Sequence, residues 1–416
     1  MPDKALPNDC FALPQGVDWT PVDTALAALR EALGPVVSRE ALPGASALGS
    51  ILAEDVVAVR SNPPAANSAI DGYGFAFDTM TDDMPLVSGR AAAGAPFEGD
   101  LPAGSAVRIL TGAVLPAGVD TVVMQEECEL LEGNRVRFLA RVKPGQNTRE
   151  AGEDVRQGDV ALPAGRRLRP QDLALIEALG VARVTVFAPL RVGVLSTGDE
   201  LVAAAQDVPA DKTFDANRPM LLALAKAWGH APVDLGHVRD DRKALKERLN
   251  QAAEQCDVVL TSGGASAGDE DHVSALLSSE GVLTHWRVAI KPGRPLALAV
   301  WDGIPVFGLP GNPVAAFVCS LIFARPALSL MSGGGWLEPQ GFDIPAAFRK
   351  SKKAGRREYL RARVTAEGRA EVFASEGSGR ISGLSWADGL VELGDAARDV
   401  KEGDLVRYIP FSSFGI

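Results

Sequence analysis

The run Asp257-Val-Val-Leu-Thr-Ser-Gly-Gly-Ala-Ser-Ala-Gly-Asp269 decides the architecture of the central part of the chain. After Asp257, the residues Val258, Val259 and Leu260 form a short apolar stretch, which is typical of a strand buried on both faces. The glycine-rich half follows directly and leads into a helix predicted over residues 272–279. The run therefore predicts a strand, a ligand-sized loop and a helix in immediate succession.

Strands and helices alternate on both sides of this run. Apolar strands are predicted over residues 191–195, 232–238, 296–300 and 305–309, and helices over 217–228, 242–255 and 313–330. This alternation predicts a doubly wound, mostly parallel α/β sheet. Ligands of such sheets bind at the carboxyl ends of the strands, where the loops after Leu195 and Leu260 lie.

The regions before and after the predicted α/β part differ from it in residue pattern. A helix over residues 22–33, capped by Asp23 or Thr24, is followed by a Gly- and Pro-rich region of short β-branched runs at 106–110, 121–124 and 135–138. Period-two stretches return beyond Trp336. The chain is therefore expected to combine the α/β domain with a β-rich domain before it and a β domain after it.

Length and composition limit the function classes. A chain of 416 residues is expected to form two to four domains. The net charge of −11 argues against general binding to nucleic acid or to an anionic membrane. No segment was expected to reach the apolar length of a membrane span, and no secretory signal is visible. Four dispersed cysteines indicate reduced thiols, so a cytoplasmic location is expected and a zinc site is not. The basic run over 349–363 is interpreted as a solvated face.

Three strings in the α/β region carry candidate chemistry. The loop 261–269 lacks a Walker ending, but its N–H groups suit a phosphate, and Asp269 and Asp271 suit a cation; the alternative is a sharp connection with Asp caps. Asp199 and Glu200 are either metal ligands or helix caps. Lys291 and Arg294 put two cations on a proline-rich turn, which favours an anionic ligand over a solvated loop.

Further candidates are less specific. Asn312 is a natural N-cap before Pro313, with a possible backbone role toward a ligand. In the β-rich region, Asp71 is either a catalytic carboxylate or part of an Asx-turn. Thr111 likewise either takes part in catalysis or simply belongs to a Thr-Gly turn. Asp154 belongs to an acidic turn that either binds a cation or is simply exposed.

Together, the order and spacing of these strings resemble the molybdopterin molybdenumtransferases, the molybdenum insertases that include the C-terminal domain of gephyrin. The strings that carry the resemblance are Asn67-Ser-Ala-Ile-Asp-Gly-Tyr73, Ile109-Leu-Thr-Gly-Ala113, Arg149-Glu-Ala-Gly-Glu-Asp154, Val194-Leu-Ser-Thr-Gly-Asp-Glu-Leu201, Asp215-Ala-Asn217, Ser262-Gly-Gly264, Lys291-Pro-Gly293 and Leu309-Pro-Gly-Asn-Pro313. Gly74, Ala265, Ala267 and Arg294 depart from the usual family residues.

The resemblance implies an elongated homodimer of four-domain subunits. The domains would be a discontinuous N-terminal α+β domain for linking and dimerisation (18–54 with 143–187), an inserted β-rich domain (55–142), the α/β molybdopterin-binding domain (188–333) and a β-barrel-like C-terminal domain (336–416). The implied reaction inserts molybdenum from molybdate into the dithiolene of adenylylated molybdopterin and releases AMP with the help of Mg²⁺.

The implied roles follow the strings. Asp199, Glu200 and Asp269 would hold Mg²⁺, and Glu200 and Asp269 would also act in catalysis with Asp71, Thr111 and Asp154. The substrate would be bound by Thr197, Gly198, Ser262, Gly263, Gly264, Ser266, Lys291, Arg294, Pro310, Gly311 and Asn312. Asp71 and Thr111 would approach the cleft from the partner subunit.

Two rival functions remain open. The related molybdopterin adenylyltransferase shares the α/β domain and the Ser-Gly-Gly loop, but it does not need the β-rich insertion or the C-terminal β domain. A non-catalytic scaffold, as in gephyrin's receptor clustering, would keep the fold, and loss of the carboxylates would signal it; all of them are present. The adenylyltransferase and molybdoenzyme maturation proteins are the expected partners, with no nucleic acid and no membrane.

Overall fold

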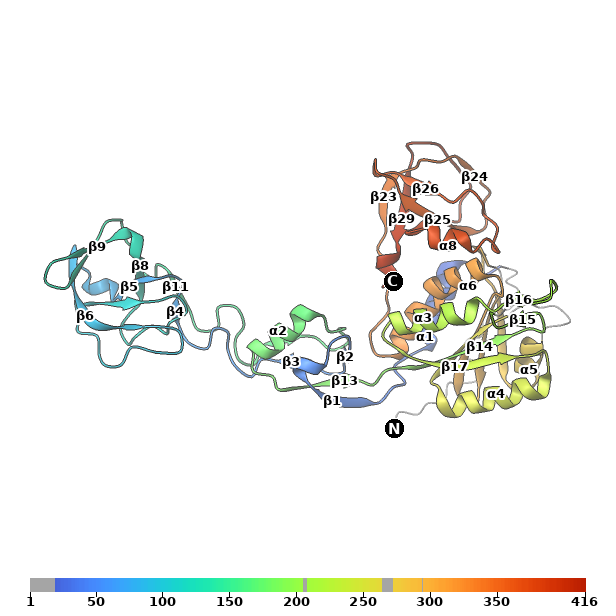
Figure 1. Cartoon of the computed structure of the whole chain (residues 1–416), viewed down its shortest axis with the longest axis horizontal. Coiled ribbons are helices and arrows are strands. Elements are labelled where there is room, and N and C mark those ends of the chain that lie inside the picture. The colour runs from blue at the N-terminus through green and yellow to red at the C-terminus, as the bar shows by residue number, and fades with distance from the viewer. Residues whose placement is uncertain (1–18, 205–207, 264–271, 294) are drawn as a thin grey trace. The chain divides into compact units, whose positions relative to one another are not determined.

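A computed structural model describes residues 19–204, 208–263, 272–293 and 295–416 of the chain (Figure 1). These residues form two compact units. The first consists of the described residues up to Glu40, of Gly49–Ala53 and of Thr185–Ile416; the second consists of Ala41–Leu48 and Glu54–Val184. The chain passes between the units in β1 (Arg39–Pro43) and in β13 (Arg183–Phe187), which is paired with β2 (Ile51–Leu52).

The first unit contains the predicted α/β sheet. Its strands, in spatial order, are β17 (Ala231–Val238), β14 (Arg191–Thr197), β18 (Val258–Ser262), β22 (Ile304–Leu309), β21 (Pro295–Trp301) and β19 (Val282–Arg287). The first four are parallel, whereas β21 and β19 run antiparallel at one side. The mostly parallel sheet is thus confirmed, and β19 is a strand that the sequence reading missed.

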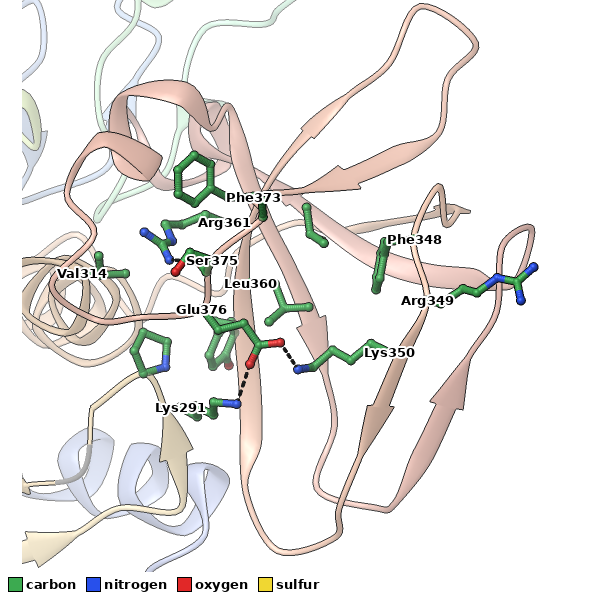
Figure 2. Close-up of a pocket in the computed structure, with 14 residues that line it drawn as sticks. Lys291, Val314, Phe348, Arg349, Lys350, Leu360, Arg361, Phe373, Ser375 and Glu376 are labelled. Carbon is green, nitrogen blue, oxygen red and sulfur yellow. Dashed lines mark hydrogen bonds and ion pairs between the residues drawn. The ribbon is translucent and has the colours of Figure 1, made fainter.

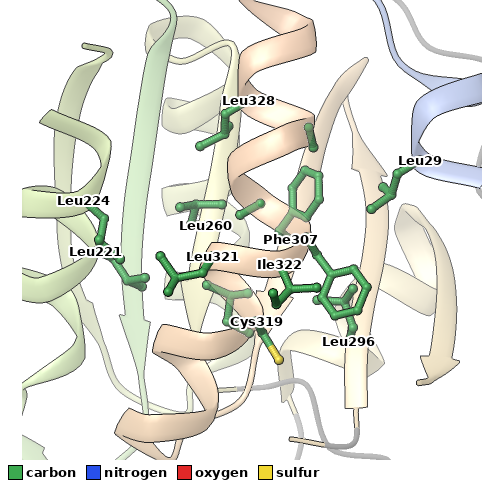
Figure 3. Close-up of a cluster of buried hydrophobic side chains, with 14 of the residues drawn as sticks. Leu29, Leu221, Leu224, Leu260, Leu296, Phe307, Cys319, Leu321, Ile322 and Leu328 are labelled. Carbon is green, nitrogen blue, oxygen red and sulfur yellow. The ribbon is translucent and has the colours of Figure 1, made fainter. Parts of the chain in front are cut away.

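Helices cover both faces of this sheet. They are α3 (Asn217–Ala227), α4 (Arg242–Gln255), α5 (His272–Glu280) and the long segment that begins at Pro313, together with α1 (Val22–Ala32). Alternate side chains of β18 enter different cores, since Val258 and Leu260 pack with α3 while Val259 packs with α4. This two-sided burial explains why the first three residues of the strand, Val258, Val259 and Leu260, are all apolar. Figure 3 shows Leu260 among side chains of α3 and of the long helix.

The long helical segment is α6 (Pro313–Cys319), a π-helical turn η4 (Ser320–Ala324) and α7 (Arg325–Met331). Against the sequence expectation, its 19 residues with a mean hydropathy of 1.9 are long and apolar enough to cross a membrane. However, 89% of its most apolar window is buried inside the fold. The segment is the central helix of the core, where Leu321, Ile322 and Leu328 meet the sheet (Figure 3).

The C-terminal part of the first unit is a second sheet. Its strands, in spatial order, are β20 (Ile290–Lys291), β25 (Arg357–Val364), β27 (Gly389–Leu393), β29 (Leu405–Pro410) and β23 (Phe342–Pro345), with β26 (Ala370–Val372) on β25. A separate two-stranded antiparallel ladder of β24 (Lys350–Lys352) and β28 (Arg398–Val400) and the short helix α8 (Ser382–Trp386) complete this part. Because β20 pairs with β25, the residue Lys291 stands opposite Glu358 in this sheet.

Two expectations in this unit were wrong, the first of them in part. The basic run is only partly a solvated face: Arg349 and Lys353 are exposed, but Lys352 is only 3% exposed, with its ammonium group donating to carbonyl groups, and Arg357 is ion-paired with Asp23. The same ion pair takes Asp23 away from capping α1, which begins after Pro21 without a side-chain cap.

The second unit is β-rich, as predicted for its central part. Its main sheet has the order β8 (Thr121–Met124), β5 (Gly72–Phe75), β7 (Ala106–Ile109), β6 (Asp83–Ala91), β10 (Arg135–Phe138) and β9 (Cys128–Leu131). Two small ladders pair β4 (Asn67–Ser68) with β11 (Thr148–Arg149) and β3 (Val56–Val57) with β12 (Val160–Leu162), and α2 (Pro170–Ala178) lies in the same unit. The four-domain division with its boundaries stays a prediction.

Candidate functional site

Three parallel strands of the α/β sheet end at one edge. The register places Ser196 of β14 opposite Ser262 of β18, and Ser262 opposite Leu309 of β22. Thr197 is the last residue of β14, and Gly263 and Gly311 lie in the loops that follow β18 and β22. The sequence predicts that all three loops take part in ligand binding. The parallel register places these strand ends side by side.

The loops approach each other so closely that glycine is required. A Cβ atom on Gly263 would lie 2.8 Å from the carbonyl oxygen of Thr197 and 3.1 Å from its hydroxyl oxygen. Gly263 also has a φ of +92°, which a residue with a Cβ atom rarely adopts. A Cβ atom on Gly311 would lie 3.8 Å from the Cα atom of Gly263. The result is a backbone cradle at the strand ends.

Asn217, to which the sequence reading gave no role, ties this cradle together. From the first turn of α3 its amide nitrogen donates to the hydroxyl oxygen of Ser262 over 2.8 Å and to the carbonyl oxygen of Gly311 over 2.7 Å. The residue is 7% exposed, and its Oδ1 atom has no hydrogen-bond partner within the described part of the chain. The Asp215-Ala-Asn217 string just before a helix was the signal that could have identified it.

The two adjacent carboxylates lie next to the end of β14. Asp199 accepts hydrogen bonds from Arg239 over 3.0 Å and from the N–H group of Asp240 over 3.3 Å. The hydrogen bond from Arg239 holds the pKa of Asp199 below its usual value. Glu200 folds back over Gly198, where a Cβ atom would be 2.5 Å from a carboxylate oxygen. These carboxylates supply the hard oxygen donors that Mg²⁺ prefers.

Several predicted residues lie outside the described part of the chain. They are Gly264, Ser266, Asp269, Asp271 and Arg294. Since Asp269 is among them, the predicted trio of Mg²⁺ ligands cannot be assembled, and the described residues contain no group of three acidic, histidine or cysteine side chains suited to a metal. The roles of these residues stay predictions.

The loop after β22 differs in detail from the expectation. Asn312 stands at the N-cap position of α6, and its carbonyl oxygen accepts the N–H group of Ala316 over 2.9 Å. The predicted N-cap position is therefore confirmed, but the side chain of Asn312 makes no capping hydrogen bond. Next to Pro313, the N–H group of Val314 donates instead to the carbonyl of Ser378, which belongs to the C-terminal part. Pro310 lies beside Gly311 at the cradle.

Lys291 lies at a pocket of about 170 Å³ that is also lined by Val314 of α6 and by residues of the C-terminal part (Figure 2). Its ammonium nitrogen is 2.6 Å from a carboxylate oxygen of Glu376 and 3.5 Å from one of Glu358. Lys350 contacts the same two carboxylates, at 3.0 Å from Glu358. The sequence reading missed this cluster, although Ser375-Glu-Gly-Ser-Gly379 combines glycine with charged and hydroxyl residues as the selected strings do.

Arg361 lies beside this cluster at the base of the pocket. It is 4% exposed and donates to the carbonyl groups of Ser375, Gly377 and Arg380. Its guanidinium also lies 5.0 Å from the centre of the Phe373 ring. Burial lowers the pKa of Arg361. Through its hydrogen bonds to the carbonyl groups, Arg361 holds the loop that carries Glu376 in place.

The second unit has its own candidate site. One oxygen of Asp71 accepts both the N–H group and the hydroxyl group of Thr111, each over 2.7 Å. The backbone bond and then the hydroxyl bond hold the pKa of Asp71 below its usual value, so the carboxylate is charged. Arg108 adds a positive charge nearby, with its guanidinium 5.1 Å from the centre of the Tyr73 ring.

Strand pairing gathers the predicted strings of this unit. Ser68 exchanges backbone hydrogen bonds with the 111–113 turn, donating to Ala113 over 2.9 Å and accepting from Gly112 over 2.8 Å. Asn67 stands opposite Arg149 in the β4–β11 ladder. Asp154 is exposed and accepts a hydrogen bond from Asn62 over 2.9 Å. The structure thus brings Asp71 and Thr111 into direct contact and places Asp154 in a turn of its own.

Family models match three segments of the chain. Residues 20–180 match the MoeA N-terminal region (domain I and II), residues 193–330 a probable molybdopterin-binding domain, and residues 343–411 the MoeA C-terminal region (domain IV). The molybdopterin molybdenumtransferase of Haemophilus influenzae is 35% identical over 397 residues, which are 94% of this chain and 98% of that protein. The molybdopterin molybdenumtransferase of Nostoc is 37% identical over 303 residues, covering 70% of this chain and 69% of that protein.

The whole fold also has a counterpart among solved structures. The molybdopterin biosynthesis moeA protein of Pyrococcus horikoshii aligns with a TM-score of 0.82 at 28% identity, over 94% of this chain and 100% of that chain. The match extends over both units. The expected multidomain α/β plus β fold is confirmed.

Proposed function

Because the chain belongs to the molybdopterin molybdenumtransferase family, we propose that it inserts molybdenum from molybdate into the dithiolene of adenylylated molybdopterin and releases AMP. The observation that carries this proposal is the cradle at the ends of β14, β18 and β22. Such an edge of a parallel sheet is where nucleotide-like ligands bind. The family relationship supplies the reaction, and the cradle supplies a place for the nucleotide.

The cradle's residues suit the phosphates of that nucleotide. The N–H group of Gly311 and the hydroxyl groups of Thr197 and Ser262 are donors close to one another at one edge, whereas the N–H group of Gly263 donates to the carbonyl group of Leu309. Asn217 fixes two of the three loops, so the donors are in place before the ligand arrives. Lys291, at the pocket beside the C-terminal sheet, would bind an anionic end of the substrate.

Magnesium is proposed as the cation of this site. Asp199 and Glu200 would hold it, with Asp269 as the third ligand, since carboxylate oxygens fit its coordination preferences. When bound, it would neutralise phosphate charge that an acidic edge cannot hold alone. In the structure Asp199 is engaged by Arg239, so coordination requires Asp199 to release that arginine.

The second unit is proposed to act on molybdate in a homodimer. Asp71 and Thr111 of one subunit would approach the cradle of the other and, with Asp154, assist the transfer of molybdenum. The charged state of Asp71 and the donors next to it support a role in handling an ion rather than in packing. The enzyme is proposed to work in the cytoplasm, to receive its substrate from molybdopterin adenylyltransferase and to pass the product to molybdoenzyme maturation proteins.

The test is AMP release from adenylylated molybdopterin by the purified full chain. Release is expected only when both molybdate and Mg²⁺ are present. Ser262→Ala should slow release, whereas Ser332→Ala, which removes a buried hydroxyl that bonds only within the turn after α7, should not. Binding of the nucleotide without release would favour a scaffold. Pyrophosphate formation from ATP and molybdopterin would favour an adenylyltransferase.

A further inference from the structure

The ion-pair cluster around Lys291 contains four charges that cancel one another, and the pocket beside it is also lined by the cations Arg349 and Arg361. Lys291 and Lys350 provide two positive charges, and Glu358 and Glu376 provide two negative charges. Glu376 uses one carboxylate oxygen for each lysine, with Oε2 at 2.6 Å from Lys291 and Oε1 in contact with Lys350. Figure 2 shows this carboxylate between the two ammonium groups.

The two carboxylates are held very differently. Glu358 belongs to the strand β25, stands opposite Lys291 in the ladder, and has a side chain only 10% exposed. Glu376 lies between β26 and α8, outside any strand or helix, and is followed by Gly377. Its side chain is 44% exposed. Glu358 is therefore a permanent counter-ion of the lysines, whereas Glu376 can leave them without unfolding a strand.

A carboxylate that spans two ammonium groups occupies the place that an oxyanion would take. Two oxygens of a tetrahedral dianion carry the same charge pattern toward Lys291 and Lys350. The lysines cannot give their full charge to such an anion while Glu376 is bound between them. An arriving anion must therefore replace the carboxylate.

We propose that Glu376 is an internal competitor for the anionic end of the substrate: it neutralises Lys291 and Lys350 in the free protein and is displaced when an oxyanion binds. The proposal deepens the proposed function and rests on it in assuming an anionic substrate. Its measurable consequence is a lower affinity, reduced by the fraction of molecules in which the lysines are free. Since the same carboxylate must leave for every such anion, the reduction is equal for different tetrahedral dianions.

The experiment measures the binding of molybdate and, separately, of sulfate to the full chain by calorimetric titration. Glu376→Gln is expected to bind both anions about tenfold more tightly than the natural protein, and Glu376→Ala is expected to act in the same direction. The matched control is Glu371→Gln, which also removes one carboxylate paired with a cation, at a side chain 40% exposed. This control should leave both affinities within about twofold.

Three results bear on the proposal. Equal tightening for molybdate and sulfate in both Glu376 variants, with weakened binding in Lys350→Gln, supports it. Unchanged or weaker binding in the Glu376 variants overturns it, and so does tightening for one anion alone. Failure of the proposed function is recognised separately, as absence of AMP release by the natural protein, because the binding titrations need no pterin substrate.

Discussion

The backbone N–H group and the hydroxyl group of Thr111 converge on the same oxygen of Asp71, each over 2.7 Å. Thr111→Val removes the hydroxyl bond and keeps the backbone bond. The pKa of Asp71, which is held low in the folded protein, is therefore expected to rise toward its usual value. The acid side of the pH profile of AMP release should move to higher pH, and carboxyl NMR should report the same shift.

The same two hydrogen bonds determine the direction in which stability changes with pH. A carboxyl group with a lowered folded-state pKa stabilises the protein above its unfolded pKa, and this contribution is lost as the pH falls through the folded value. In Thr111→Val this stabilising contribution of Asp71 should therefore be lost at a higher pH than in the natural protein. Thr81→Val is the control, because its hydroxyl bonds to the carbonyl of Asp83, in the same unit as Asp71. An unchanged acid side in Thr111→Val would contradict a role for this pair.

Gly263→Ala should damage the cradle beyond the ordinary effect of a positive φ angle. The added Cβ atom would lie 2.8 Å from the carbonyl oxygen of Thr197, so β14 and β18 must separate at their ends. We expect a loss of at least about 2 kcal/mol in the free energy of unfolding and a loss of nucleotide binding.

Gly403→Ala isolates the conformational part of that effect. Gly403 has a φ of +90°, close to the +92° of Gly263, but nothing lies within 4 Å of its built Cβ atom. Its substitution should cost about 1 kcal/mol and leave nucleotide binding intact. Equal behaviour of the two variants in chemical denaturation and in nucleotide titration would show that the close approach to Thr197 is unimportant.

Asn217→Ala should separate the loops that follow β18 and β22. Removing the amide leaves the Gly311 carbonyl and the Ser262 hydroxyl without their partner, which should cost about 1–3 kcal/mol of stability. Nucleotide affinity should fall as well. Asn250→Ala, which removes a hydrogen bond to Trp301 on the opposite face of the sheet, should leave nucleotide affinity unchanged. Equal nucleotide affinities in the two variants would refute the positioning role of Asn217.

Arg239→Gln tests the proposed metal ligand. Arg239 holds Asp199 over 3.0 Å in an exposed ion pair, and a Mg²⁺ ion bound by Asp199 must compete with it. The variant should need a severalfold lower Mg²⁺ concentration for half-maximal AMP release, on the order of threefold. Arg137→Gln, which breaks an exposed pair with Glu129, should leave the Mg²⁺ dependence unchanged. A higher Mg²⁺ requirement in Arg239→Gln would contradict metal binding at Asp199.

Much of the fold could be predicted from short-range patterns. The helix Arg242–Gln255 and the strands Thr121–Met124 and Arg135–Phe138 have the predicted bounds, because periodicity and turn residues fix them locally. The strand β19 and the antiparallel direction of β21 were not predicted. A strand's direction depends on which neighbour it pairs with, and a single sequence does not encode that choice locally.

The site divides in the same way. The strand-end loops were found because buried strands followed by glycine signal a ligand edge, and the structure brings Thr197, Gly263 and Gly311 together. The cluster around Glu376 was missed because its members are far apart in the sequence. Lys291 and Glu376, for example, are separated by 85 residues. The interpretation of the basic run was partly wrong for a related reason, since the carboxylates that pair with Lys350 and Arg357 come from distant parts of the chain.

The short strand β20 connects Lys291 to both the α/β sheet and the C-terminal sheet. In the chain Lys291 lies between β19 and β21 of the α/β sheet, yet its own strand is paired with β25 of the C-terminal sheet. Any tilt of the C-terminal sheet must therefore carry the lysine along with it. If Lys291 binds the substrate anion as proposed, the bound substrate would also restrain the orientation of the C-terminal sheet.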